Sequence, residues 1–228
     1  MKERGMIFNG EMVRAILDGR KTQTRRPVKF PVHDKNLGCE LAGNELAGEL
    51  SAGNYLNSAF GKPGDRIWVR EAFRVHSRAT DVATLAYKAS ERNSWTEQTH
   101  RVPVAVCNKP ATPEKWTPSL HMPRWASRIL LEITDVRVER LNAISEEGAQ
   151  REGVHTEVWD QTVVARNYED SDEFFQFWSD DMPHYVEMNQ LYRSSFRSLW
   201  DSIYGEESWK ANPWVWVIEF KRVEGGAA

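Results

Sequence analysis

The chain has few cysteines, no long apolar run and no excess of one charge, and each absence removes a class of protein. Two cysteines, Cys39 and Cys107, are too few for a disulfide scaffold or a cysteine-rich zinc site. No apolar run approaches the roughly 20 residues of a membrane-spanning helix, and residues 1–10 lack the apolar core of a signal peptide. With 30 Lys and Arg against 33 Asp and Glu, a globally basic surface for nucleic acid is excluded, but a local basic patch is not. We expect a cytoplasmic protein with no membrane association.

What remains is an ordinary globular composition with an unusual number of tryptophans, 10 in 228 residues. The length favours one domain, spanning residues 1–223, with a disordered tail at 224–228. Insertions are expected near 31–62, 75–115 and 155–186. Strand patterns outnumber helix patterns and do not alternate with them evenly. This favours an α+β class, with a small twisted β-barrel and flanking helices, over a doubly wound sheet.

Hydrophobic periodicity and capping residues predict the individual elements. The segment 31–62, rich in Gly, Asn, Ala and Ser, is interpreted as a long insertion or loop. Helices are predicted over 9–19, 145–153 and 188–204, and strands over 66–73, 85–88, 129–141 and 214–223, with a short extended segment over 22–26.

A basic cluster follows the first predicted helix. Five of the ten residues from Arg20 to Lys29 are basic in a chain whose net charge is -3. Such a cluster offers phosphate contacts, and its arginines, Arg20, Arg25 and Arg26, offer bidentate donors. The alternative is a solvated charged segment that offsets the dipole of the preceding helix.

An acid near the end of the second predicted helix stands out by its position. Ser145 is an N-cap candidate, which is a structural role. Glu152 lies near the C-terminal end of that helix, where the helix dipole opposes a carboxylate. This placement indicates a cationic partner such as Lys21, although an exposed acid is the ordinary alternative.

The segment 116–128 interleaves two tryptophans, two arginines and a histidine between prolines. Aromatic rings and guanidinium planes stack on unpaired bases, so Arg124, Trp125 and Arg128, together with Trp68, are candidates for binding a base or a strand. The alternative is a loop whose tryptophans plug the core.

No pattern indicates a metal or a cofactor. The six histidines are scattered, no pair has the spacing of helical metal ligands, and no cysteine lies near one at zinc-finger spacing. The chain also has no Gly-rich phosphate loop and no Gly-x-Ser-x-Gly turn. We therefore expect neither a metal nor a cofactor.

The segment 17–26, Leu-Asp-Gly-Arg-Lys-Thr-Gln-Thr-Arg-Arg, resembles the signature of the ASCH domain (activating signal cointegrator homology) family. Its motif positions fall on Gly19, Arg20, Lys21, Thr24 and Arg26. Further segments resemble other family elements in the same order along the chain: 63–69, 129–141, 149–153 and 216–220.

The resemblance implies a PUA-like fold linked to RNA, most similar to the larger phage- and prophage-encoded members. Small bacterial N4-acetylcytidine amidohydrolases of this family use a Lys, a Thr and a Glu. Matched by motif, these positions are Lys21, Thr24 and Glu152, and Thr at position 24 favours that branch. RNA is favoured over DNA as a polymeric partner.

These observations predict an amidohydrolase acting on an N4-acylated cytidine or a related modified nucleoside or RNA. Lys21 would serve as the base if its pKa were depressed, and Glu152 would orient it or shuttle a proton. Whether the acyl group passes to Thr24 or to an activated water stays open. The alternatives are a non-catalytic module that binds RNA or DNA and reads a modified base, and a metal-independent ribonuclease.

Overall fold

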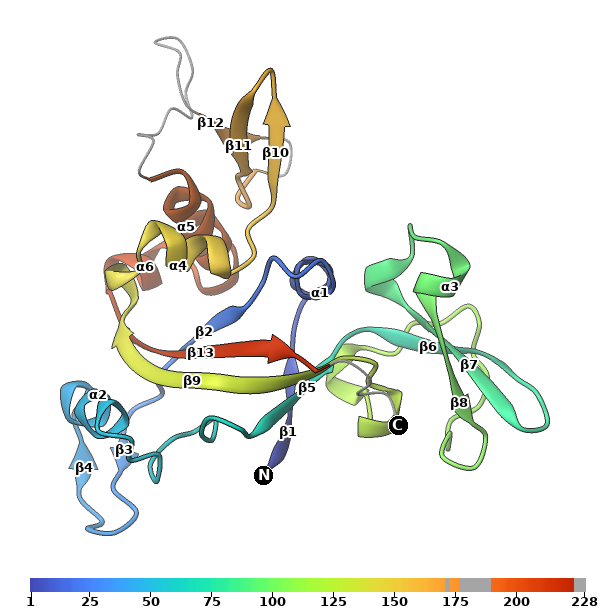
Figure 1. The fold of residues 1–228 in the computed structure, drawn as a ribbon, viewed down its shortest axis with the longest axis horizontal. Coiled ribbons are helices and arrows are strands. Elements are labelled where there is room, and N and C mark those ends of the chain that lie inside the picture. The colour runs from blue at the N-terminus through green and yellow to red at the C-terminus, as the bar shows by residue number, and fades with distance from the viewer. Residues whose placement is uncertain (171–172, 177–189, 224–228) are drawn as a thin grey trace. The chain divides into compact units, whose positions relative to one another are not determined.

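The computed structural model describes residues 1–170, 173–176 and 190–223 (Figure 1). The chain divides into two compact units. Unit 1 comprises Met1–Asp18, Gly64–Ile133 and Lys221–Ala228, and unit 2 comprises Gly19–Pro63 and Thr134–Phe220. The prediction of a single domain over 1–223 stays a prediction.

The first part of unit 1 contains three paired strand segments and one helix. Strand β1 (Glu3–Ile7) runs parallel to β5 (Arg66–Arg70), and β5 pairs antiparallel with the beginning of β9 (Leu130–Arg140). Helix α1 (Gly10–Leu17) begins after Asn9, whose side chain accepts a hydrogen bond from the N–H of Met12 at 2.8 Å. The predicted N-cap is therefore confirmed.

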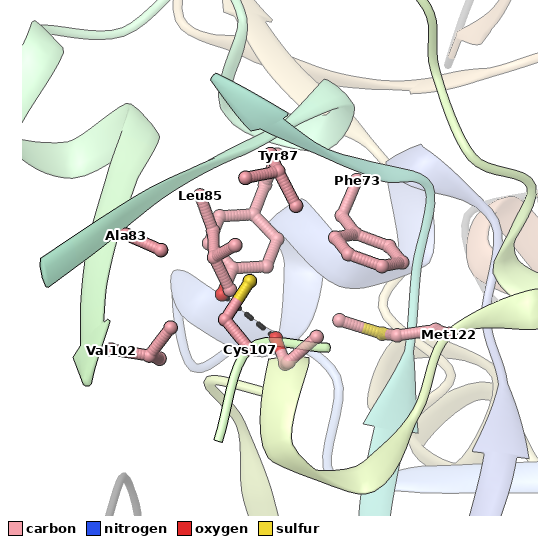
Figure 2. Close-up of a cluster of buried hydrophobic side chains, with 9 residues drawn as sticks. Phe73, Ala83, Leu85, Tyr87, Val102, Cys107 and Met122 are labelled. Atoms are coloured by element: carbon pink, nitrogen blue, oxygen red, sulfur yellow. Dashed lines mark hydrogen bonds between the residues drawn. The ribbon is translucent and has the colours of Figure 1, made fainter. Parts of the chain in front are cut away.

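The second part of unit 1 is an antiparallel meander over its own core. It consists of β6 (Phe73–Arg78), β7 (Val82–Tyr87) and β8 (Thr99–Pro103), with short turns of helix between β7 and β8 and after β8. The core contains Phe73, Val75, Ala83, Leu85, Tyr87, Val102, Cys107, Met122 and Ala126, most of them labelled in Figure 2. The short helices are η1 (Lys88–Ser90), α3 (Trp95–Gln98), η2 (Ser119–His121) and η3 (Arg124–Ala126).

Unit 2 is built around an antiparallel strand pair and a group of helices. Strand β2 (Gln23–Pro27) pairs with β13 (Trp214–Arg222), so that Thr24 lies opposite Ile218. Helices α4 (Glu146–Arg151), α5 (Leu191–Tyr204) and α6 (Glu206–Lys210) lie next to one another in chain order (Figure 1). The turn η4 (Leu141–Ala143) leads from β9 into α4.

Two insertions form small additional elements in unit 2. The first holds β3 (Val32–His33), β4 (Glu40–Leu41) and α2 (Gly43–Ser51), and the second holds β10 (Thr156–Trp159), β11 (Thr162–Arg166) and β12 (Phe174–Gln176). At the start of α2, Gly43 lies against the indole of Trp214. A Cβ at position 43 would come within 2.3 Å of that ring, so the helix can pack there only with glycine.

The mixed α+β class is confirmed, and the predicted helices and strands are found within a few residues of their expected bounds. The predicted barrel is not closed: none of the sheets among the described residues closes on itself. The strands of the insertions pair with their own sequence neighbours, in sheets of two or three strands, and do not extend a larger sheet. The PUA-like assignment stays a prediction.

The insertions themselves differ from expectation in content. The segment 31–62, interpreted as a loop, contains helix α2, and the segment 75–115 contains most of the three-stranded meander where one strand was predicted. The tail at 224–228 and part of the 155–186 insertion lie outside the described residues. Within the part of the chain that is described, no helix combines the length and the apolar character needed to cross a bilayer.

Candidate functional site

The beginning of β2 is docked onto helix α4 by hydrogen bonds from successive residues. The N–H of Thr22 donates to the carbonyl oxygen of Arg151 at 2.9 Å, and the side-chain amide of Gln23 donates to the carbonyl oxygen of Gly148 at 2.7 Å. Helix α4 is in turn capped by Ser145, whose hydroxyl accepts from the N–H of Gly148 at 3.0 Å. These bonds place the basic cluster beside the C-terminal end of α4.

Lys21 and Glu152 form a buried ion pair at this junction. The Lys21 Nζ donates to Glu152 Oε2 at 2.9 Å and to the Glu152 carbonyl oxygen at 2.7 Å. Their side chains are 0% and 2% exposed. The cationic partner expected from the position of Glu152 at the end of its helix is present, and the two residues come from segments 131 positions apart.

Arg25 binds the second oxygen of the same carboxylate. Its Nη1 donates to Glu152 Oε1 at 3.0 Å, and its Nη2 donates to Glu139 Oε1 at 2.6 Å. The Arg25 side chain is 2% exposed. Arg25 was predicted to bind substrate or nucleic acid, but in this structure its guanidinium lies between two protein carboxylates rather than on the surface.

The pKa of Lys21 is set by two opposing influences, burial and the ion pair with Glu152. Burial lowers the pKa of Lys21 below its ordinary value because the charged form loses hydration, and the nearby cations of Arg26 and Arg25 lower it further. The ion pair with Glu152 opposes this effect, but burial dominates. A lysine whose pKa is lowered by burial loses its proton more readily than an exposed lysine, which is how lysines come to serve as general bases.

Thr24 is close to this cluster in sequence but is not bonded to it. It is buried, with 2% exposure, and lies opposite Ile218 in the ladder with β13. Side chains alternate across a strand, so Thr24 is directed away from the face that carries Gln23 and Arg25. Among the described residues, no hydrogen bond joins its hydroxyl to Lys21 or Glu152. The structure thus brings together two of the three candidate catalytic residues.

The remaining basic residues of the cluster lie at its edges. Arg20 Nη1 donates to the carbonyl oxygens of Gly153 at 3.0 Å and Val154 at 3.3 Å. Arg26 is half-buried and faces Trp216 in the strand register. Arg20 follows Gly19, whose positive φ of 75° turns the chain from α1 toward β2.

Two pockets in unit 2 are lined in part by helix α4. The larger, of about 310 Å³, is within the size range of small-molecule sites. It is lined by Gly19, Arg20, Thr22, Gln150, Arg151, Val154, Thr156 and Tyr192. The smaller, of about 110 Å³, is lined by Gln23, Arg25, Arg137, Glu139, Ala143, Ser145, Glu147, Gly148 and Arg151. The described lining of the larger pocket therefore includes sequence neighbours of Lys21 and Glu152 but neither of these two residues.

Four of the predicted binding residues belong to unit 1 and contact other residues of that unit: Trp68, Arg124, Trp125 and Arg128. Arg124 Nε binds Glu3 at 2.9 Å near the surface, whereas Arg128 binds the buried Glu71 through both carboxylate oxygens. The ring of Trp125 meets Phe73 edge to face, 6.3 Å between centroids. Trp68 is half-buried beneath Arg70, whose guanidinium lies 5.4 Å from its ring.

These contacts favour the plug interpretation of the 116–128 segment. Met122 and Ala126 belong to the buried core of unit 1, and Trp125 packs against that core. The Tyr87 hydroxyl donates to the carbonyl oxygen of Ala126 at 2.8 Å, the dashed line in Figure 2. The segment is thus anchored by its backbone and by its apolar side chains.

Sequence reasoning missed Glu139 and Tyr192. Glu139 lies at one of the polar positions of an alternating strand, which is usually a solvated site. Tyr192 lies in the first turn of an amphipathic helix, where an aromatic residue is ordinarily part of the packing. Neither position has a local signal, because each contributes only through residues distant in the chain.

Comparison with known proteins assigns neither a family nor a function to this site. Among the described residues, no group of three or more His, Cys, Asp or Glu side chains is arranged to hold a metal ion. No family model, no curated protein and no solved structure matches this chain.

Proposed function

We propose that this chain is an ASCH-like amidohydrolase that removes the acyl group from an N4-acylated cytidine or a related modified nucleoside. The observation that supports this proposal is the buried Lys21–Glu152 pair, in which burial lowers the pKa of the lysine. The pair occurs at the two positions that the family resemblance marks, on segments that only the fold brings together. A 310 Å³ pocket lined by their sequence neighbours offers room for a substrate.

In the proposed reaction, neutral Lys21 takes a proton from a water molecule as the water oxygen attacks the acyl carbonyl carbon. The tetrahedral intermediate then collapses, the bond between the acyl carbon and N4 breaks, and the proton held by Lys21 passes to the leaving N4 amine. The products are a carboxylic acid and cytidine. Glu152, held by both Lys21 and Arg25, orients the amine throughout.

The geometry favours an activated water over an acyl-threonine intermediate. A nucleophilic hydroxyl needs a base within hydrogen-bonding reach, and no such bond joins Thr24 to Lys21 in the described residues. The direction of the Thr24 side chain on β2 points to the same conclusion.

A non-catalytic nucleic-acid-binding role has less support. Arg25, Arg124 and Arg128 each form an ion pair with a carboxylate of this chain. Binding a phosphate through any of them would require breaking that pair. Within the basic cluster itself, Lys21 and Arg25 are paired with Glu152, and Arg25 also with Glu139.

The test is hydrolysis of N4-acetylcytidine, followed by chromatography of the released cytidine. The wild type should turn over, and Lys21→Met should lose at least about 100-fold in kcat because the base is gone. Thr24→Val should lose less than about tenfold, since water is the proposed nucleophile. Unfolding measured by circular dichroism checks that each variant is folded.

A folded wild type that releases no cytidine from a panel of N4-acylated cytidines would refute the activity. An acetyl adduct on Thr24, detected by mass spectrometry during turnover, would replace the water route with the acyl-threonine route.

A further inference from the structure

The larger pocket in unit 2 has a single aromatic residue in its described lining, Tyr192, and several neutral polar groups. Thr22, Gln150 and Thr156 supply hydroxyl and amide groups that can donate and accept hydrogen bonds. One aromatic wall with convergent polar groups is typical of sites that stack a flat heterocycle and bind its edge.

Tyr192 is fixed in position by helix α4. The carboxylate of Glu146, in the first turn of α4, accepts the N–H of Tyr192 at 2.6 Å through Oε1 and the N–H of Arg193 at 2.9 Å through Oε2. Arg193 also donates through its Nη2 to the carbonyl oxygen of Asn142 at 3.0 Å. The first turn of α5 is therefore held at a defined place beside α4.

Helix α4 connects this anchored aromatic residue to the ion pair. Glu146 lies at its first position and Glu152 caps its last turn. One short helix thus sets the positions of Tyr192 and of the carboxylate that binds Lys21. Three of the lining residues, Gln150, Arg151 and Val154, come from α4 and the residues just beyond it.

We propose that the pocket binds the pyrimidine ring of the substrate, stacked on Tyr192, and that Tyr192 determines specificity for a nucleobase over other acylated amines. This inference rests on the proposed function, because the ring and the scissile amide belong to one molecule. Its consequence is that the enzyme selects N4-acylated pyrimidines by ring stacking and does not hydrolyse simple acylated amines efficiently.

The variants Tyr192→Phe and Tyr192→Ala test this assignment, with Tyr204→Ala as the matched control. Tyr204 is a half-exposed tyrosine at the opposite end of α5 and is absent from the described lining of the pocket. We expect Tyr192→Ala to raise KM for N4-acetylcytidine about 5- to 100-fold, the usual effect of removing one stacked aromatic ring. Tyr192→Phe keeps the ring, so its KM and that of Tyr204→Ala should stay within about twofold of wild type.

Calorimetric titration with cytidine, the product, separates this proposal from the proposed function. If N4-acetylcytidine is not hydrolysed but cytidine binds and Tyr192→Ala weakens that binding, the hydrolase proposal fails and the pocket assignment holds. If hydrolysis occurs but Tyr192→Ala leaves both KM and cytidine affinity unchanged, the pocket assignment is overturned and the hydrolase stands. Absence of cytidine binding by the wild type would also overturn it.

Discussion

Each unit of the molecule contains a glutamate that is buried in an ion pair, Glu71 in unit 1 and Glu152 in unit 2, and the two pairs are built differently. Glu71 in unit 1 and Glu152 in unit 2 are both 2% exposed. Glu71 is held by one arginine, with Arg128 Nε on Oε1 at 2.9 Å and Nη2 on Oε2 at 3.0 Å. Glu152 instead divides its two oxygens between a lysine and an arginine.

The two pairs differ in whether the cation can give up its proton. Besides Glu71, Arg128 donates hydrogen bonds to Ser90 Oγ and to the carbonyl oxygen of Glu97, each at 2.9 Å. Its guanidinium also lies 4.1 Å from the centroid of the Tyr87 ring. A guanidinium does not release its proton in a protein. The ammonium group of a lysine can, and burial lowers the pKa of Lys21, so it loses its proton more readily than an exposed lysine does. The comparison teaches that the chemistry of the cation, not the burial of the acid, marks the candidate site.

The first prediction, with the largest expected effect, concerns neutralising the carboxylates of Glu152 and Glu71 in turn. Glu152→Gln should lower kcat for N4-acetylcytidine by about 10²–10⁴, the usual contribution of one acid–base group. Glu71→Gln changes a carboxylate of similar burial outside the proposed site and should leave kcat within about twofold. Steady-state kinetics of the two variants, each checked for folding, make the comparison. Equal losses in both would show that the effect is structural.

The second prediction concerns the free energy of unfolding. Arg128→Met leaves Glu71 buried without its cation, and burial already raises the pKa of this carboxyl. The loss should be about 3–5 kcal/mol, as for other broken buried pairs. Urea titration measures it. The control is Arg124→Met, which breaks the partly exposed pair with Glu3 and should cost less than about 1 kcal/mol. A loss from Arg128→Met as small as that control would show that the Arg128–Glu71 pair does not stabilise the fold.

The third and smallest expected effect is a shift in the pH dependence of turnover. The reaction needs neutral Lys21, so the rate should rise with pH through the pKa of Lys21 and level off before its ordinary value of 10.5. Arg25→Gln removes a cation that lowers this pKa, so the rise should move to higher pH. Arg137→Gln is the control, because Arg137 pairs with Glu139 and Glu219 and not with Glu152. A shift to lower pH in Arg25→Gln would contradict this electrostatic account.

Local patterns predicted the elements whose stability is local. The cap at Asn9, the alternation over 129–141 and the aromatic strand over 214–223 are each visible within one segment and are present in the structure. Helix α2 was missed because its small residues hide the two leucines, Leu46 and Leu50, that bury its apolar face. Only one strand of the meander was predicted. Outside their shared core the three strands are mostly polar, and that core forms only when the strands pair.

The sequence also predicted part of the candidate site. The position of Glu152 at the end of a helix indicated a cationic partner, and the pair with Lys21 is present. The burial of Arg25 was not foreseeable, because it depends on Glu139 from a distant strand. Likewise, the place of Tyr192 depends on Glu146, 46 residues earlier in the chain. Such contacts arise from the fold and have no local signature.

The spacing between Glu146 and Glu152 carries a constraint for any variation of this protein in evolution or engineering. Glu146 binds the first turn of α5, and Glu152 binds Lys21. The six-residue α4 must therefore keep both its length and its helical phase. Inserting one residue would turn one acid by about 100° relative to the other, since each residue of a helix advances by that angle. A change of length between Glu146 and Glu152 should therefore break one of these two contacts.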